Sequence, residues 1–214
     1  MDVFGERWEN YTERLYDNWQ STVAANDTVI IPGDVSWATY IEDAFEDFSF
    51  INRLNGSKII LKGNHDYWWT TLRKMNKFIE ENNFSSIKII HNTAVECENA
   101  AVCGTRGWSI RENGVDTDEN RRIFDREKQR LILSLEQAVR LKKERIIVGM
   151  HYPPIDREDS ESAFLDIMKN YGVESCVYGH LHSYAHSRAF EGTKNGVHMK
   201  LVSCDYINFT PILV

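Results

Sequence analysis

The apolar residues of the chain follow two alternating patterns. Short continuous runs, rich in isoleucine and valine, end in a glycine, a proline or another turn residue, which is typical of buried strands. Between them lie longer segments in which apolar residues recur every three or four positions, as on one face of a helix. Strands that alternate with helices in this way predict an α/β fold with a largely parallel sheet.

Five segments carry the helical pattern. The predicted helices span 6–25, 37–54, 69–81, 118–143 and 160–170. In the second helix the apolar stripe begins at Trp37, and the fourth helix should direct Leu131, Leu135 and Val139 toward the core. Each helix should therefore cover a sheet with one face.

The remaining apolar runs predict strands. They span 28–34, 58–66, 86–91, 145–154, 175–182, 187–192, 197–205 and 209–214, with further short strands between 93 and 109. The dipeptide Asn195-Gly196 is typical of a tight turn between two antiparallel strands. The C-terminal part is therefore expected to be rich in strands.

Composition narrows the class of protein. The 214 residues fit a single domain that covers the whole chain, 1–214. Hydrophobic residues make up 42% and charged residues 27%, which is ordinary for a globular protein and excludes a disordered or fibrous chain. Thirty-two acidic and 25 basic side chains give a formal charge of -7, which disfavours nucleic acid as a partner.

Cysteine usage and hydropathy predict a cytoplasmic protein. The four cysteines form no C-x-x-C pair, so we expect buried, reduced thiols. The first ten residues carry acids where a signal peptide has a basic stretch, and no run approaches the roughly 18 apolar residues of a membrane span. We therefore expect no membrane partner.

Side chains that bind metals follow four of the predicted strands. They are Asp34 after VIIPG, Asn64 and His65 after IILKG, His151 after IIVGM, and His180 and His182 after CVYG. Ligands of open α/β sheets bind beyond the carboxyl ends of the strands, so these four ends can converge. Carboxylate, amide and imidazole groups suit Mn, Fe, Zn or Co, and differ from the thiolates of a structural zinc site.

Each of these side chains also has a structural interpretation. Asp34 or Ser36 suits the N-cap of the helix expected at Trp37, and Asn64 or Asp66 suits the N-cap of the following helix. A lone histidine at a strand end is most often a hydrogen-bonded turn residue. Four compatible residue types after four strands nevertheless favour the joint interpretation, a metal site.

The motifs GDVSW, GNHD, an isolated His151 and GHLH resemble the successive motifs of the calcineurin-like metallophosphoesterase superfamily. The resemblance spans Gly33 to His182 and continues into the strand-rich tail. It implies an α/β fold in which two mixed β-sheets pack as a sandwich flanked by helices. It also implies two divalent transition-metal ions, bridged by an aspartate and a hydroxide.

The resemblance assigns the metal ligands residue by residue. Asp34 would bridge the two ions, and Asn64, His151 and His180 would complete the protein ligands of one ion. His182 would bind the other ion.

The resemblance also implies the catalytic residues and the reaction. His65 would protonate the leaving oxygen or stabilise charge on phosphorus, with Asp66 orienting its ring. Metal-activated hydroxide would then hydrolyse a phosphate monoester or diester, and the substrate would be a phosphorylated small molecule. Arg106 is a weaker candidate, because a guanidinium group can hold substrate phosphate by two hydrogen bonds.

One motif of the superfamily is missing from this sequence. The first motif, D-x-H on an opening strand, has no counterpart before the helix that begins at Glu6. The chain therefore offers a full protein ligand set for only one ion, and the first strand of the fold is expected to be absent. Our preferred hypothesis is that Met1 is an internal methionine and that a short upstream strand precedes it in the natural protein.

Two alternatives to the phosphoesterase interpretation stay open at this point. The first is a divergent member that binds one metal ion or none and serves as an interaction scaffold. The second keeps the chemistry but makes the substrate a nucleic acid, as in a nuclease, although the acidic composition counts against it.

Overall fold

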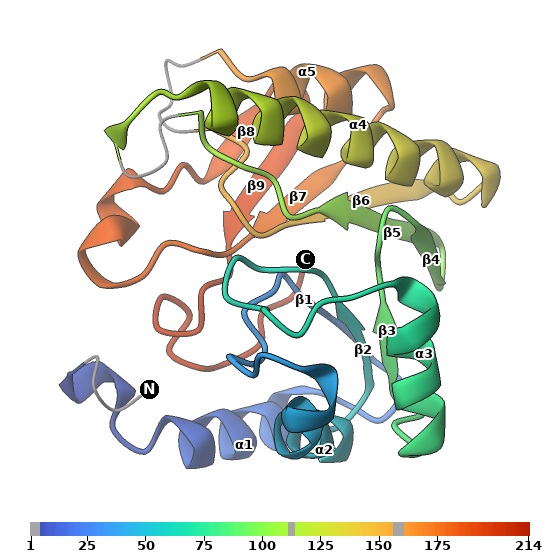
Figure 1. Cartoon of the computed structure of the whole chain (residues 1–214), viewed down its shortest axis with the longest axis vertical. Coiled ribbons are helices and arrows are strands. Elements are labelled where there is room, and N and C mark those ends of the chain that lie inside the picture. The colour runs from blue at the N-terminus through green and yellow to red at the C-terminus, as the bar shows by residue number, and fades with distance from the viewer. Residues whose placement is uncertain (1–4, 111–113, 156–160) are drawn as a thin grey trace.

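Two β-sheets with helices on their outer sides form the structure (Figure 1). The computed structural model describes residues 5–110, 114–155 and 161–214. This arrangement confirms the predicted α/β fold of two packed sheets flanked by helices. In both sheets, each pair of neighbouring parallel strands is paired over three to six residues.

The smaller sheet has three parallel strands in the order β1-β2-β3. Their bounds are Thr28–Ile31 for β1, Ser57–Ile60 for β2 and Ile87–Ile89 for β3. The short helix η3 (Ile41–Ala44) and helix α2 (Phe45–Arg53) connect β1 to β2, and α3 (Leu72–Glu81) connects β2 to β3. Crossover helices of this kind are what parallel neighbouring strands require.

The larger sheet is mixed, with the strand order β4-β5-β6-β7-β9-β8. The strands are Ala94–Cys97 (β4), Ala100–Thr105 (β5), Arg145–Met150 (β6), Ser175–Tyr178 (β7), Gly192–Lys194 (β8) and Val197–Leu201 (β9). The inner four strands run parallel, and β4 and β8 pair antiparallel at the two edges. Helices α4 (Asp118–Arg140) and α5 (Ala163–Asn170) cover its outer face (Figure 1).

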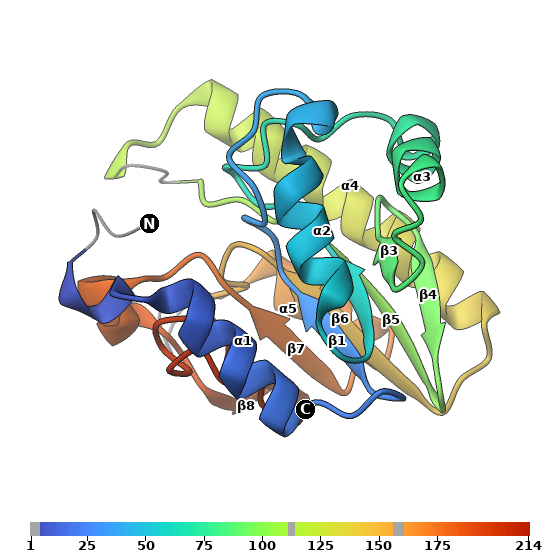
Figure 2. The ribbon, with the colours of Figure 1, turned by 90° about the horizontal axis from the view of Figure 1, so that it is seen from below.

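Apolar side chains fill the space between the two sheets. Ile59 and Leu61 of the β2 region pack against Val102 of β5 and Ile147 of β6. Helix α1 (Tyr11–Thr22) follows the short helix η2 (Glu6–Trp8) and packs on the smaller sheet through the buried Trp19. Figure 2, seen from below, shows α1 and α2 side by side beneath the strands.

Both capping interpretations of the candidate metal residues are wrong. The helical segment after β1 begins only at Ile41, where no side chain caps it, and Trp37 lies outside it with 49% of its surface exposed. Helix α3 is capped by Thr71, whose hydroxyl accepts a hydrogen bond from the Lys74 amide. The acidic and amide side chains after β1 and β2 are therefore free of these structural roles.

The tail differs most from its expected strands. Residues 187 and 188 end the short helix η5 (Ser183–Arg188), 189–191 have no regular structure, 192 begins β8, and 209–214 form no strand. The predicted hairpin is confirmed, since β8 and β9 are joined by Asn195 and Gly196, both with positive φ.

The expectation of buried thiols holds for two of the four cysteines, since Cys97 and Cys204 are only partly buried. All four cysteines are free thiols, and Cys103 and Cys176 are buried. Among the helices of the described residues, none combines the length and the apolar character of a membrane span.

Candidate active site

The turns after β1 and β2 pack directly against each other. A Cβ atom on Gly63 would lie 2.0 Å from Asp34 Oδ1, and one on Gly33 would lie 2.3 Å from the Gly63 nitrogen. Gly33 also has a φ of +94°, which residues with side chains rarely adopt. Both glycines are therefore needed to bring Asp34 beside the segment that carries Asn64.

The carboxylate of Asp66 holds the same two turns together. Its Oδ2 accepts hydrogen bonds from the amides of Gly63 at 2.7 Å and Asp34 at 2.8 Å. Its Oδ1 accepts from the Val35 amide at 2.8 Å and the Trp68 indole at 3.1 Å. Burial raises the pKa of Asp66, and the amide hydrogen bonds oppose that rise. Asp66 is thus a positioning residue for both turns.

Oxygen and nitrogen atoms of four side chains lie close together between the two sheets. Asn64 Oδ1 lies 2.6 Å from His151 Nε2 and 3.1 Å from His180 Nδ1, and the two ring nitrogens are 3.2 Å apart. Asp34 Oδ2 lies 3.5 Å from His151 Nε2. We call these four residues the convergent cluster. They follow β1, β2, β6 and β7, so each sheet supplies two of them.

The convergent cluster gathers hydrogen-bond acceptors around His151. The ring of His151 is buried, and its Nδ1 donates to the Pro32 carbonyl at 2.9 Å, which leaves the lone pair on Nε2. Burial lowers the pKa of both His151 and His180 to about 3, so these rings are neutral at pH 7. The Nε2 lone pair therefore faces the amide oxygen of Asn64, with the Asp34 carboxylate close by.

Acceptors that face one another repel unless a cation or proton lies between them. One ring proton on His180 Nδ1 satisfies only part of this set, because that atom is near both Asn64 and His151. Nitrogen and oxygen donors of this kind match a divalent transition-metal ion. The residues present therefore fit such an ion chemically.

The fit of a metal ion to the convergent cluster depends on the amide oxygen of Asn64. Within residues 5–110, 114–155 and 161–214, no three histidine, cysteine, aspartate or glutamate side chains are spaced to hold a metal ion by themselves. Asn64 Oδ1 is within 3.1 Å of both rings, whereas Asp34 stands farther from His151. The Asn64 amide oxygen thus lies close to both histidine rings of the cluster.

His182 lies apart from the convergent cluster in its contacts. Its Nδ1 donates to Asp205 Oδ1 at 2.7 Å, and its ring packs edge-on against Trp8. The buried Asp205 also accepts from the Ser183 amide at 2.8 Å. Although burial alone raises the pKa of Asp205, the hydrogen bonds from His182 and Ser183 lower it to about 2. Asp205 is therefore ionised and fixes the His182 ring.

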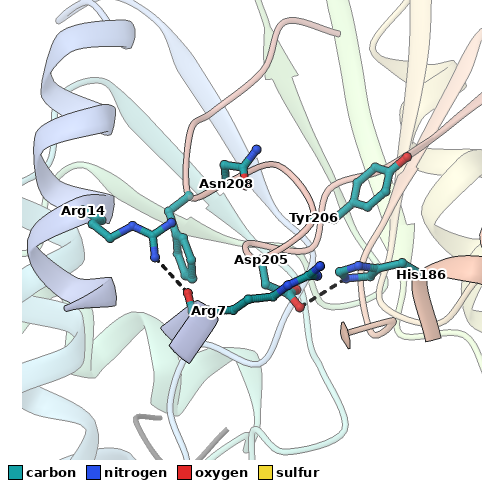
Figure 3. Close-up of a pocket in the computed structure, with 7 residues that line it drawn as sticks. Arg7, Arg14, His186, Asp205, Tyr206 and Asn208 are labelled. Carbon is teal, nitrogen blue, oxygen red and sulfur yellow. Dashed lines mark hydrogen bonds and ion pairs between the residues drawn. The ribbon is translucent and has the colours of Figure 1, made fainter. Parts of the chain in front are cut away.

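Asp205 also borders a cavity of about 350 Å³ (Figure 3). His186 Nε2 lies 3.2 Å from Asp205 Oδ2, and Arg7 and Arg14 line the same cavity. Arg14 donates to the Arg7 carbonyl at 2.8 Å, as the dashed line in Figure 3 marks. Sequence reasoning missed Asp205, yet a signal was present, because the residue follows β9 as the other acidic and histidine side chains follow their strands.

His65 and Arg106 flank the convergent cluster without belonging to it. The His65 amide donates to Asp34 Oδ1 at 2.8 Å, while its ring Nδ1 contacts the Tyr67 hydroxyl at 3.0 Å. The expectation that Asp66 orients this ring is wrong, since the Asp66 oxygens bind backbone amides and an indole instead. The Arg106 carbonyl accepts a hydrogen bond from the His151 amide at 3.1 Å. This bond connects the end of β5, which Arg106 follows, to the convergent cluster.

Comparison with known proteins points to one family. A family model described as calcineurin-like phosphoesterase matches residues 6–184, a range that contains the convergent cluster and His182. No curated protein matches the sequence significantly.

Two solved structures are similar in fold. The protein TT1561 of Thermus thermophilus has a TM-score of 0.56 at 14% identity, covering 82% of this chain and 78% of that one. The phosphopantetheinyl hydrolase PptH from Mycobacterium tuberculosis has a TM-score of 0.50 at 12% identity, covering 89% of this chain and 86% of that one. At such identities the likeness concerns the fold alone.

Proposed function

Because the chain belongs to the calcineurin-like phosphoesterase family, we propose that it hydrolyses a phosphate monoester or diester of a small molecule. The observation that supports this proposal is the convergence of acceptor atoms from Asp34, Asn64, His151 and His180. These four side chains would hold one divalent transition-metal ion, for which manganese is our first choice. When bound, such an ion lowers the pKa of coordinated water to about 7 and supplies hydroxide at neutral pH.

Neighbouring groups prepare the site for this reaction. The Pro32 carbonyl keeps the lone pair of His151 on Nε2, and Asp66 fixes the two turns that carry Asp34 and Asn64. His65 is our candidate for donating a proton to the leaving oxygen, with the Tyr67 hydroxyl restraining its ring.

We assign a second divalent ion to the side of the cluster where His182 lies. Asp205 accepts the Nδ1 proton of His182 and so leaves its Nε2 lone pair available, an arrangement that orients many metal-binding histidines. Asp34 would then be the bridging carboxylate between the two ions. His182 and Asp34 are the protein ligands that we propose for this ion.

A non-catalytic scaffold that binds one metal ion or none is the second candidate. The observation in its favour is that no three histidine, cysteine, aspartate or glutamate side chains in the described part of the chain are spaced to bind a metal unaided. A scaffold predicts no hydrolysis with any added metal.

We also propose that the chain acts as one domain in the cytoplasm. Its four unpaired thiols support a reducing compartment.

A metal-supplemented assay tests the proposed function. Metal-stripped protein receives Mn²⁺, Fe²⁺, Zn²⁺ or Co²⁺ and is offered p-nitrophenyl phosphate, bis-p-nitrophenyl phosphate or single-stranded DNA. We expect hydrolysis of a small ester, and a loss of more than about 100-fold in kcat/KM for His151→Asn, because even supporting residues of metal sites contribute 10- to 100-fold. The matched control is His198→Asn, on the exposed side of β9.

The other outcomes separate the candidates. Metal binding without hydrolysis of any substrate would favour the scaffold, and cleavage of DNA alone would favour a nuclease. An equal loss of activity in both histidine variants would remove the convergent cluster from the mechanism.

A further inference from the structure

A partly enclosed cavity of about 210 Å³ lies beside the convergent cluster. It occupies the carboxyl ends of β2, β3 and β5, where Lys62, His91 and Arg106 line it, and Glu127 and Arg130 of α4 complete its wall. None of the four residues of the convergent cluster lines this cavity. A group bound here would therefore be a different group from one held at the cluster.

The cavity carries an excess of positive charge. Lys62, Arg106 and Arg130 supply three cations, whereas Glu127 is the one carboxylate in the lining. Both Glu127 oxygens are already used, Oε2 by the Thr105 hydroxyl at 2.5 Å and Oε1 by Arg130 at 2.6 Å and Arg106 at 3.4 Å. Arg106 and Arg130 share this one carboxylate, and among the described residues Lys62 forms no ion pair, so the lining carries a net charge of about +2.

Hydrogen-bond donors in the lining are also left without partners. Arg106 Nε is buried and has no hydrogen-bond partner among the described residues, while the guanidinium is held 4.5 Å from the centre of the Trp108 ring. The Trp69 indole donates to His91 Nδ1 at 3.1 Å, so the neutral His91 ring carries its proton on Nε2 as a further donor. A buried donor without a partner destabilises the folded protein, and an anionic ligand that accepts its hydrogen bond would offset this cost.

The chain connects this cavity closely to the convergent cluster. Lys62 precedes Asn64 by two residues, so the Cα atoms of these residues are at most about 7 Å apart. The Arg106 carbonyl accepts hydrogen bonds from the amides of His151 and Tyr152, at 3.1 and 2.8 Å. One small molecule can therefore reach both the cavity and the convergent cluster.

We propose that this cavity binds a second phosphate group of the substrate while the ester to be hydrolysed lies at the convergent cluster. The inference rests on the proposed function and names its substrate class, a small molecule that carries two phosphate groups. A volume of 210 Å³ is below the roughly 300 Å³ of a complete ligand pocket, so the cavity takes one anionic group rather than a whole substrate. Arginine and lysine together supply the donors that phosphate oxygens require.

Phosphate binding without metal tests the proposal directly. Inorganic phosphate is titrated calorimetrically into the full chain in the presence of a chelator, so that no metal ion contributes. We expect saturable binding by the unmodified chain and a loss of at least about tenfold in affinity for Lys62→Met, since hydrogen bonds to charged groups are the strong ones. Lys77→Met is the matched control, because Lys77 is exposed on α3 and pairs with Glu81.

A conservative variant and a second position guard against misfolding. Lys62→Arg keeps the charge and should retain phosphate affinity within about threefold, whereas Arg130→Gln should weaken it as Lys62→Met does. Phosphate that binds only after metal is added would overturn the cavity proposal and leave the proposed function standing. Equal affinity in Lys62→Met and Lys77→Met would overturn it as well, and hydrolysis assays remain a separate test of the function.

Discussion

One backbone carbonyl decides which nitrogen of His151 can meet a cation. Pro32 directly follows β1, and its carbonyl accepts the Nδ1 proton of a ring that follows β6 in the other sheet. Proline has no amide proton of its own to donate, so this carbonyl is its only polar backbone group. A residue that follows a strand of the smaller sheet therefore sets the tautomer of a residue that follows a strand of the larger one.

His65 gives the residue-scale prediction. Its ring packs against Trp37 at 5.2 Å between centroids and contacts Tyr67, while only its backbone amide reaches Asp34. His65→Gln should lower kcat by about 10²- to 10⁴-fold, the usual contribution of a general acid, with metal affinity preserved. Steady-state kinetics at saturating Mn²⁺ and a calorimetric metal titration measure the two quantities.

Tyr67→Phe is the control for ring orientation. It removes only the hydroxyl that restrains His65, so its effect on kcat should stay below about tenfold. A parallel loss of metal affinity in His65→Gln would instead make His65 a metal ligand and contradict the proton-donor role.

At the scale of single elements, strand β2 carries a buried lysine. The Lys58 ammonium donates to the carbonyls of Leu54 at 2.6 Å and Gly56 at 2.9 Å, at the turn where α2 leads into the strand. Its side chain is fully buried, and this burial lowers its pKa from 10.5 to about 8. The folded protein therefore releases the Lys58 proton at a lower pH than the unfolded chain does.

This difference predicts that Lys58 makes stability depend on pH. Between pH 8 and 10.5 the unfolded chain binds more protons at Lys58 than the folded protein, so the free energy of unfolding rises with pH. The slope is at most about 1.4 kcal/mol per pH unit. Urea unfolding of the unmodified chain and of Lys58→Met at pH 7, 8, 9 and 10 measures it.

The comparison with Lys58→Met isolates the lysine from other titrating groups. The free energy of unfolding of the unmodified chain minus that of Lys58→Met should be constant below pH 8 and should increase above it. A difference that stays flat up to pH 10 would mean that the pKa of Lys58 is not lowered.

Helix α4 shows how far the apolar pattern determines an element. Its N-terminus at Asp118 and its buried Leu131 and Leu135 were predicted from the sequence, but Val139 is 50% exposed and Ala138 is buried instead. Spacings of three and four residues are both compatible with one helix face, so the pattern cannot choose between positions 138 and 139. The smaller side chain faces the core here, and the valine faces solvent.

At the scale of the whole molecule, the sequence pattern predicted that four candidate residues lie close together, but it did not identify the partner of His182. Asp34, Asn64, His151 and His180 each follow a strand, and the carboxyl ends of parallel strands meet at one edge. The partner of His182 is Asp205, which lies 23 residues farther along the chain after an antiparallel hairpin. Its position depends on how β9 is placed beside β7, and local periodicity carries no information on that pairing.

The distribution of the convergent cluster over both sheets gives a prediction about metal and stability. The smaller sheet supplies Asp34 and Asn64, and the larger supplies His151 and His180, so one ion would link the two sheets. An ion that binds only the folded state at 100 times its Kd adds about 2.7 kcal/mol to the free energy of unfolding. In a protein of this size that corresponds to a rise in Tm of roughly 5–10 °C.

Thermal unfolding with Mn²⁺, and again after a chelator is added, measures this rise and its reversal. Asn64→Ala should abolish the metal-dependent rise in Tm, because it removes an oxygen that lies within 3.1 Å of a nitrogen of each histidine ring. His198→Asn on the exposed side of β9 should keep the full rise. Since each variant is compared with itself with and without metal, any loss of intrinsic stability cancels. An equal rise in Asn64→Ala would place the ion outside the convergent cluster, and the ion would then not link the two sheets there.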